Sequence, residues 1–139
     1  MPIMMDADAL AVFMKDVFKQ VADDFGIDHV GETDLTTRLL VSDRHLRPGG
    51  TVSGPSIFAL ADVSAYLMTL ARIGPKALAV TTNCSIDFMR KPEAGVDLIA
   101  KTRLLKLGKL LSVCDVLVFS DGMEQPVARA SLTYAIPPK

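Results

Sequence analysis

A single carboxylate, Asp62, lies inside a long apolar stretch and is the residue most capable of chemistry in this chain. The stretch runs over residues 56–72, and Asp62 and Arg72 are its only charged residues. A helix that is apolar on every side is normally buried, and a buried carboxylate is costly unless it is paired or hydrogen-bonded. Ionisable groups in such places are frequent at functional sites. Asp62 is therefore a candidate general base or nucleophile. The alternative is a structural carboxylate that caps a loop or pairs with Arg47.

The residues just upstream of this stretch are typical of a helix N-terminus. Ser53 can act as the N-cap, and Pro55 is tolerated in a first turn, where backbone N–H groups lack intrahelical partners. Such free N–H groups stabilise negative charge, so Gly54 is a candidate oxyanion donor about two turns before Asp62. Ser53 is predicted to be a cap rather than a nucleophile, because no histidine stands in an activating pattern and Gly-x-Ser-x-Gly is absent.

Length and composition predict one folded domain over residues 1–139. Half of the 139 residues are hydrophobic and 22% are charged, which argues against a disordered chain. The formal net charge is −1, and near neutrality argues against a general attraction to nucleic acid or to a membrane surface. No RNA-recognition signature occurs. We therefore expect neither nucleic acid nor membrane as a partner.

Cysteine and histidine content argues against a metal site. Cys84 and Cys114 are far apart in strand-like runs, which is typical of small core or sheet residues in a reducing compartment. Only His29 and His45 supply imidazoles, and no Cys/His cluster has metal spacing. The N-terminus lacks the pattern of a signal peptide, and the segment around Asp62 is too short and interrupted for a membrane span. We expect a cytoplasmic protein without metal or redox cofactor.

Helices and a strand are predicted in the first half of the chain. An amphipathic helix is expected at about residues 5–24, because apolar residues recur there at spacings of three and four: Leu10, Phe13, Met14, Val17, Phe18 and Val21. Gly26 suits its end. β-branched residues favour a strand at residues 35–41, and residues 47–50 are typical of a loop. The buried helix then covers about residues 54–72, before Gly74 and Pro75.

The second half changes to a period of two and predicts a sheet. Four strands are expected at about residues 77–88, 95–106, 110–120 and 126–136, and their short turns favour an antiparallel meander. In the first of them, strict alternation puts Thr81, Asn83, Ser85 and Asp87 on one face and Thr82, Cys84, Ile86 and Phe88 on the other. The apolar face needs a cover, and the buried helix is the natural one. The fold class is therefore α+β, a long curved antiparallel sheet wrapped around a central helix.

This order of elements resembles the hotdog-fold acyl-CoA thioesterases, particularly the phenylacetate-pathway (PaaI-like) type. The resemblance covers about residues 36–136 and rests on HLRPGGTVSGPSIFALAD at 45–62, VTTNCSIDFMRKP at 80–92 and LKLGK at 105–109. It implies a hotdog fold, a homodimer or homotetramer, and hydrolysis of an acyl-CoA substrate. It also implies that the strand at residues 77–88 pairs with its symmetry mate in the partner subunit.

By position in this resemblance, three residues correspond to the catalytic ones. Asp62 matches the catalytic carboxylate, Gly54 the glycine whose N–H polarises the thioester carbonyl, and Thr81 a hydroxyl residue that helps to hold the attacking water. Asp62 and Gly54 would come from opposite subunits. The chain departs from the family at three positions, with Arg47 in place of Asn, Ser53 in place of His and Pro55 in place of a second Gly. These departures bear on how thioester and water are positioned.

The remaining candidates would bind substrate. Ser53 and Pro55 belong to the predicted helix start. Arg47 lies in the loop before it, where it could bind a phosphate or thioester oxygen or simply be solvated. Thr81 and Asn83 are expected to line a cleft or subunit interface. Four basic residues stand at strand ends that we expect to lie close to the helix start. They could bind the phosphates of CoA, although such charges usually only solvate turns: Arg90, Lys91, Lys106 and Lys109. The acyl pocket would be apolar and built from Phe58, Ala61 and Ala65 together with residues across the interface.

The sequence therefore predicts an acyl-CoA thioesterase in which Asp62 activates water or attacks the thioester directly. The first alternative is a non-catalytic acyl-CoA or fatty-acyl binding protein, which the departures at Arg47, Ser53 and Pro55 favour. A second is a hotdog dehydratase or hydratase, which resembles a motif with His and Asp together at the active site, and no His occupies this helix start. The identity of the acyl chain stays open.

Overall fold

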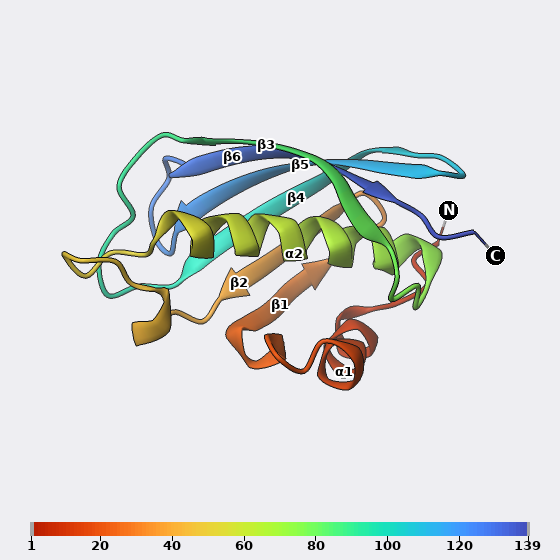
Figure 1. Cartoon of the computed structure of the whole chain (residues 1–139), viewed down its shortest axis with the longest axis horizontal. Coiled ribbons are helices and arrows are strands. Elements are labelled where there is room, and N and C mark those ends of the chain that lie inside the picture. The colour runs from red at the N-terminus through yellow and green to blue at the C-terminus, as the bar shows by residue number, and fades with distance from the viewer. Residues whose placement is uncertain (1, 139) are drawn as a thin grey trace.

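A curved, six-stranded antiparallel sheet wraps around one long helix in the computed structural model, which describes residues 2–138 (Figure 1). The spatial order of the strands is β1-β2-β4-β5-β6-β3. Their bounds are Phe25–Val30 for β1, Asp34–Leu39 for β2, Val80–Phe88 for β3, Leu98–Leu107 for β4, Leu111–Ser120 for β5 and Ala128–Ala135 for β6. This arrangement confirms the predicted α+β hotdog fold.

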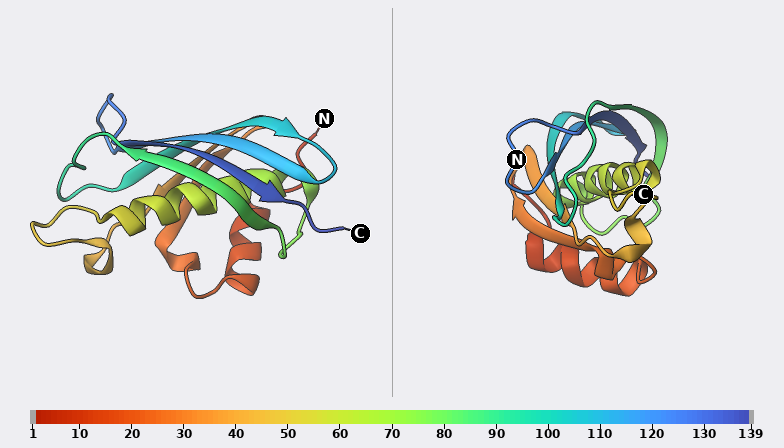
Figure 2. Two further views of the ribbon diagram at one scale, coloured as in Figure 1. Left: turned by 45° about the horizontal axis from the view of Figure 1, so that its top comes forward. Right: turned by 90° about the vertical axis from the view of Figure 1, so that its left-hand side faces the viewer.

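The central helix α2 spans Gly54–Ile73, as the apolar stretch predicts. The Ser53 side chain caps it by accepting a hydrogen bond from the Ser56 N–H at 3.4 Å, Pro55 stands in the first turn, and Gly74 with φ 91° ends it. The helix lies inside the curve of the sheet, as the end-on view of Figure 2 shows. Most of its residues are buried there, including Leu60, Ala61 and the whole run from Val63 to Ala71.

The expectation that this segment is too short for a membrane span is wrong, because its length and composition are those of a helix that could cross a membrane. Helix α2 has 20 residues and contains an 18-residue window with a mean hydropathy of 1.4, which meets the requirement for a membrane-crossing helix. Its apolar surface, however, is largely covered by the sheet, and 67% of that window is buried inside the structure. A buried helix of this kind is typical of a protein core.

The strand order corrects the predicted four-strand meander. Strands β4, β5 and β6 do follow one another through short turns, but β3 pairs with β6 and not with β4. The nine residues between β3 and β4 carry the chain across the end of the sheet, so that β4 enters beside β2 (Figure 2). A connection of nine residues is long enough for this crossover, and the turn residues within it do not specify a hairpin. Strand β3 is consequently an edge strand.

The N-terminal region differs from the expected helix at residues 5–24. Helix α1 spans Ala7–Val17, with Asp6 as its N-cap accepting from the Ala9 N–H at 2.9 Å. The chain then turns through a short 3₁₀ helix, Ala22–Asp24, into β1, a strand that the sequence pattern did not indicate. The apolar spacing continues past Val17 because Phe18 and Val21 face a pocket rather than a helix-packing surface.

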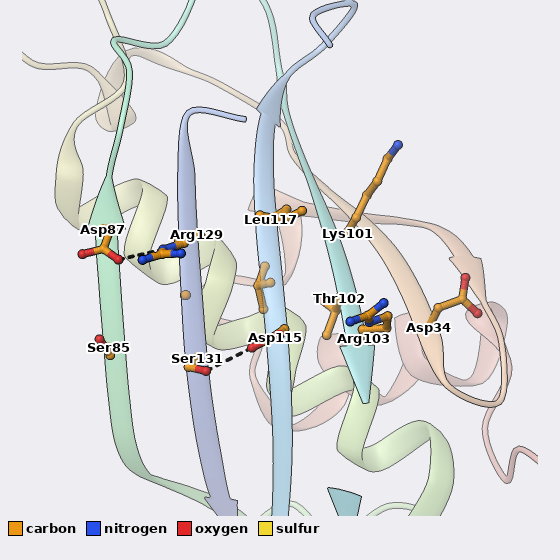
Figure 3. A pocket seen from close by; sticks show the side chains of 12 residues that line it. Asp34, Ser85, Asp87, Lys101, Thr102, Arg103, Asp115, Leu117, Arg129 and Ser131 are labelled. Atoms are coloured by element: carbon orange, nitrogen blue, oxygen red, sulfur yellow. Dashed lines mark hydrogen bonds and ion pairs between the residues drawn. The ribbon is translucent and has the colours of Figure 1, made fainter. Parts of the chain in front are cut away.

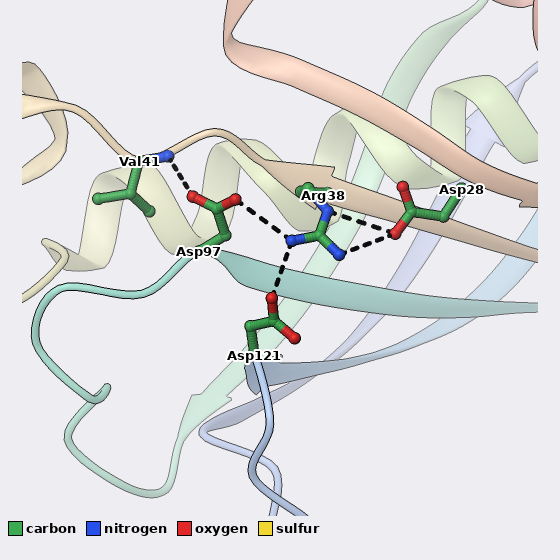
Figure 4. Close-up of polar contacts among 5 residues, drawn as sticks. All are labelled: Asp28, Arg38, Val41, Asp97 and Asp121. Carbon is green, nitrogen blue, oxygen red and sulfur yellow. Dashed lines mark hydrogen bonds and ion pairs between the residues drawn. The ribbon is translucent and has the colours of Figure 1, made fainter.

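One cluster of charges ties four elements together near the start of α2 (Figure 4). Arg38 on β2 donates hydrogen bonds to Asp121 at 2.9 Å, to Asp97 at 3.2 Å and, through two nitrogens, to Asp28 at 3.2 and 3.3 Å. Asp97 in turn accepts from the Val41 N–H at 3.0 Å. Hydrogen bonds to the surrounding carboxylates, that of Asp121 first, raise the pKa of Arg38 above its ordinary value. The cluster anchors the chain that leads from β2 toward the helix start.

Candidate active site

The Asp62 carboxylate is held by two hydroxyl groups that come from the sheet. Asp62 lies half-buried on α2, and its Oδ1 accepts hydrogen bonds from Thr81 Oγ1 at 2.6 Å and from Tyr134 Oη at 2.8 Å. The Tyr134 hydroxyl also lies 3.0 Å from the backbone carbonyl oxygen of Asp62. Among residues 2–138, no hydrogen bond or ion pair reaches Oδ2. Arg47 does not pair with this carboxylate, so the structural alternative based on that pair is wrong.

A β-bulge in β3 brings Thr81 to the carboxylate. Thr81 is paired with Tyr134 on β6, and the next pair is Asn83 with Thr133, so Thr82 is an extra residue. An extra residue of this kind reverses the alternation of side chains along the strand. Thr81 therefore faces α2, whereas Asn83 is exposed on the outer side of the bulge. The predicted sharing of one face by Thr81 and Asn83 is wrong for this reason.

Tyr134 is the site residue that the sequence analysis missed. It is buried, with 4% of its surface exposed, on the inner face of β6, where it follows Ala128, Ala130 and Leu132 at intervals of two. That row is the signal that could have found it, because a buried tyrosine hydroxyl normally needs a hydrogen-bond partner. Burial raises the pKa of Tyr134 above its ordinary value, and the negative charge of Asp62 raises it further. The hydroxyl is therefore protonated at neutral pH.

The carboxylate opens into an apolar pocket of about 510 Å³. Five aromatic side chains line this pocket, together with aliphatic residues from α1, α2 and β3: Phe18, Phe25, Phe58, Tyr66 and Tyr134. Phe18 and Tyr66 meet edge to face, with ring centroids 6.4 Å apart, and Tyr66 lies 5.9 Å from Tyr134. Phe58 was expected here. Ala61 and Ala65 were also expected, but they are fully buried in the core and do not line the pocket.

A second group of candidate residues gathers around the start of α2. Gly54 is the first residue of the helix, so its N–H has no intrahelical acceptor. It lies eight residues before Asp62, a separation of about 12 Å along the helix axis. The Phe88 ring at the end of β3 would lie 3.6 Å from a Cβ added at Gly54. Arg90 and Lys91 follow Phe88 closely in the chain, and both are exposed. Within one chain, Asp62 and Thr81 therefore lie together, whereas Gly54 lies apart from them at the start of α2.

The loop before α2 is held by a buried histidine. His45 is 6% exposed, its Nδ1 accepts from the Ser42 N–H at 2.9 Å, and its carbonyl accepts from the Ser53 N–H at 2.8 Å. Its Nε2 lies 3.5 Å from Asp24. These contacts are those of a loop-holding residue. Arg47 is exposed, and its backbone N–H is bonded to the Thr51 carbonyl at 2.9 Å.

The four basic residues proposed for CoA do not form one cluster in the chain. Arg90 and Lys91 follow β3 at the end of the sheet where α2 begins. Lys106 and Lys109 lie near the β4–β5 turn, where Leu111 pairs with Ala135, beside the other end of α2. The two pairs are separated by the length of a strand, about 30 Å. The expectation that all four stand close to the helix start is therefore wrong for Lys106 and Lys109.

A larger hollow of about 610 Å³ lies on the outer face of the sheet, away from α2 (Figure 3). Two pairs of polar side chains meet across neighbouring strands there. Arg129 donates to Asp87 at 2.8 Å, and Ser131 donates to Asp115 at 3.0 Å. Such pairing is typical of a solvated sheet face. Within residues 2–138, no group of His, Cys, Asp and Glu is arranged to hold a metal ion.

Comparisons of the sequence with known proteins agree with this geometry. The family model described as "Thioesterase superfamily" matches residues 49–127, more than half of the chain and a range that includes Gly54, Asp62 and Thr81. A Pseudomonas aeruginosa protein that carries the name of an esterase is 31% identical over 107 residues, which cover 76% of this chain and 78% of that protein.

Crystal structures of similar proteins share the fold. A protein of Silicibacter sp. TM1040, described as a thioesterase, is 58% identical and has a TM-score of 0.93, with 99% of this chain and 96% of that chain covered. The phenylacetic acid degradation protein PaaI of Thermus thermophilus is 25% identical, with a TM-score of 0.71 over 91% of this chain and 99% of that chain. A Streptococcus mutans protein, determined with bound acetyl CoA, is 27% identical, with a TM-score of 0.71 over 83% and 90% of the two chains. From its fold and from the family match, the chain belongs to the thioesterase superfamily.

Proposed function

We propose that this protein hydrolyses an acyl-CoA thioester, with Asp62 as the catalytic carboxylate. The observation that carries the proposal is a half-buried carboxylate at the wall of an aromatic pocket, with one oxygen held by two hydroxyls and the other open. The pocket would take the acyl group, and its apolar lining suits a chain or ring without charge. The similar Streptococcus mutans protein, which was determined with acetyl CoA, supports CoA as the thiol component.

Two chemical routes fit the open carboxylate oxygen. In the first, Asp62 takes a proton from a water molecule as the water oxygen bonds to the thioester carbon, and the carbon–sulfur bond then breaks with the proton passing to the CoA thiolate. In the second, Asp62 itself attacks the carbon and CoA leaves as the thiolate. Water then hydrolyses the resulting anhydride, which releases the free acid, restores the Asp62 carboxylate and supplies the proton that converts the thiolate to the thiol. A general base typically contributes about 10²–10⁴-fold in rate. Either route develops negative charge on the carbonyl oxygen, which needs a donor.

The Gly54 N–H is the proposed donor, supplied by a second copy of the chain. Within one chain it lies too far from Asp62 to share a carbonyl with it, at about 12 Å. In each chain, Thr81 of β3 meets Asp62, and Phe88 at the far end of β3 meets Gly54. Antiparallel pairing of two β3 edge strands would therefore bring the helix start of one subunit toward Asp62 of the other.

The glycine itself supports a role in close approach. Position 54 has no positive φ, and an added Cβ would lie 3.6 Å from the Phe88 ring, an ordinary contact. The packing of a single chain therefore does not require glycine there. A substrate carbonyl or a partner subunit that approaches the backbone closely would require it.

Non-catalytic binding of acyl-CoA is the second candidate function, because Arg47, Ser53 and Pro55 depart from the family pattern. Asp62→Asn separates the two, since it keeps size and removes charge. Hydrolysis of a panel of acyl-CoA esters should fall by at least about 10²-fold, while calorimetric binding of the acyl-CoA persists. Asp87→Asn, on the outer sheet face, is the matched control. Binding without turnover in the unaltered protein, or full turnover in Asp62→Asn, would contradict the thioesterase proposal.

A further inference from the structure

We propose that Tyr134 is a positioning residue for Asp62. Together with Thr81, Tyr134 binds the Oδ1 atom of Asp62 and so leaves Oδ2 as the reactive oxygen. This inference rests on the proposed function and adds a residue to its site. The contacts that carry it are the Tyr134 Oη–Asp62 Oδ1 distance of 2.8 Å and the Thr81 Oγ1–Oδ1 distance of 2.6 Å.

Two donors on one oxygen orient a carboxylate more strictly than one donor does. A carboxylate held at a single point can rotate and exchange its two oxygens, whereas donors from two different strands fix the plane and the identity of the occupied oxygen. Tyr134 Oη also lies 3.0 Å from the backbone carbonyl oxygen of Asp62, so the same hydroxyl bridges the side chain and the main chain of one residue. The free oxygen then keeps one direction, which a reaction at a bound thioester requires.

The tyrosine is itself rigid. Its side chain is 4% exposed, its ring packs beside Tyr66, and its strand β6 is paired with β5 on one side and with β3 on the other. Thr81 is its direct cross-strand partner, at the point where the bulge at Thr82 turns Thr81 inward. The two hydroxyls therefore arrive from neighbouring positions of one sheet and do not depend on a flexible loop.

The hydroxyl remains a donor over the working pH range. Burial and the Asp62 charge raise the pKa of Tyr134, so the phenol stays protonated at neutral pH. Tyr134 lies outside residues 49–127, the range of the family match. The geometry thus assigns a role to a residue that this chain supplies beyond the matched region.

Tyr134→Phe tests the assignment, because it removes only the hydroxyl and keeps the buried ring. We expect kcat to fall about 10- to 100-fold, the effect of losing one hydrogen bond to a charged group, with KM within about threefold of the parent. Turnover is taken per folded molecule, with the folded fraction measured by thermal unfolding at the assay temperature. Thr69→Val is the matched control. It removes a buried hydroxyl elsewhere in the core, that of Thr69 on α2, which is bonded to Ser112 at 2.8 Å. It should lower stability without lowering kcat.

A double variant examines whether both hydroxyls act through the same oxygen. Thr81→Val should also lower kcat, and Thr81→Val with Tyr134→Phe should lose clearly less than the product of the two single losses, because the carboxylate already rotates once one donor is gone. A kcat of Tyr134→Phe within about threefold of the parent, a change in KM alone, or strictly multiplicative losses would overturn the inference.

Comparison with Asp62→Asn separates this failure from failure of the proposed function. If Asp62→Asn is inactive and Tyr134→Phe retains its kcat, the positioning inference alone is wrong. If Asp62→Asn retains full activity, or the unaltered protein hydrolyses no acyl-CoA, both proposals are wrong.

Discussion

At the scale of residues, the site is defined by the hydrogen bonds that offset the desolvation of the Asp62 carboxylate. Asp62 is stabilised by two neutral hydroxyl donors and by no cation within residues 2–138. A paired arginine would neutralise the charge and occupy both oxygens, as bidentate pairs do. Neutral donors leave the negative charge on the carboxylate and one oxygen open. An arrangement of this kind costs stability and keeps the group reactive, which is the usual reason for retaining a charge in an apolar place.

Gly54→Ala should separate the needs of the fold from those of the site. The added methyl group meets only the Phe88 ring at 3.6 Å, and no positive φ opposes it. We expect the melting temperature to stay within a few degrees and kcat/KM for acyl-CoA to fall at least about tenfold, because the methyl group blocks close approach to the N–H. Thermal unfolding and steady-state kinetics measure the two effects. Undiminished activity would exclude a close approach at this backbone.

Tyr134 should also make the folded state sensitive to alkali. Below its ordinary pKa of 10.0 the hydroxyl is protonated in both folded and unfolded states, so the raised pKa in the fold has no effect on stability. Above pH 10 the unfolded chain ionises and the folded one does not, so stability is lost by about 1.4 kcal/mol per pH unit.

Chemical unfolding at about pH 8 to 11 measures this dependence. The advantage of the parent over Tyr134→Phe should be constant up to about pH 9.5 and should shrink above it. A difference that is independent of pH would show that Tyr134 ionises equally in both states.

At the scale of elements, α1 and β3 build the site around the central helix. The end of α1 contributes Val17 and Phe18 to the pocket wall, and the bulge of β3 turns Thr81 toward Asp62. Neither element contributes much to the core. Most of β3 is exposed, and only Leu10 and Met14 of α1 are fully buried. Elements at the periphery can vary without loss of the core, so they are suited to determine which acyl group enters.

Phe18→Ala should weaken acyl binding without slowing the reaction. The ring lies against Tyr66 at the pocket wall, and Phe18 is 36% exposed. Its removal should therefore take apolar surface from the pocket and lower the stability of the fold only slightly. We expect KM for a pocket-filling acyl-CoA to rise roughly three- to tenfold, with kcat within about twofold. Acetyl-CoA, which leaves the pocket largely empty, should respond less. Val12→Ala, on the exposed side of α1, serves as control, and an equal response there would assign the effect to helix stability.

Arg90 and Lys91 should bind the nucleotide end of CoA. They are exposed and follow β3 beside the helix start. If Gly54 polarises the thioester carbonyl there, the phosphates of the CoA moiety would lie near these two residues. Neutralising both to Gln should raise KM for acyl-CoA with kcat nearly unchanged, and a short thioester without the nucleotide should be unaffected. The KM effect should shrink as salt rises, because exposed charges are screened.

Lys101→Gln with Arg103→Gln is the control for Arg90 and Lys91. It removes the same charge from the outer face of the sheet, the face away from α2. If this control raises KM as much, the effect is one of net charge. If both thioesters respond to the change at residues 90 and 91, these residues support the fold.

At the scale of the whole molecule, the open edge of β3 is where we expect a second subunit to pair. Apolar residues gather along or beside this edge, with Leu78 at 82%, Val80 at 56% and Phe88 at 53% exposure. Unpaired edges with apolar side chains invite pairing with another chain. The division of the site points the same way, because Asp62 and Gly54 lie at different points along α2.

The isolated protein should therefore be a dimer or tetramer at micromolar concentration. Sedimentation equilibrium or light scattering measures the mass directly, against 15.0 kDa for the chain. Specific activity should fall on dilution once the subunits dissociate, because the Gly54 N–H of one subunit is then lost to the other. A fully active monomer would contradict a site shared between subunits.

The sequence alone determined the central helix and most of the sheet. The helix from Gly54, its Ser53 cap, its stop at Gly74 and the strands after it follow from local patterns, because burial on all sides, capping chemistry and alternation are properties of neighbouring residues. The same local logic singled out Asp62, since a charge in an apolar stretch is visible without knowing what surrounds it.

Only the tertiary structure decided the partners of Asp62. Strand β1, the pairing of β3 with β6, the bulge that turns Thr81 inward and the meeting of Tyr134 with Asp62 all depend on residues far apart in the chain. A nine-residue connection can close a hairpin or cross the sheet, and one extra residue reverses every later side chain of a strand. Neither choice costs much locally. Each is made by the packing of the complete sheet around α2, which is why position in the sequence could not reveal it.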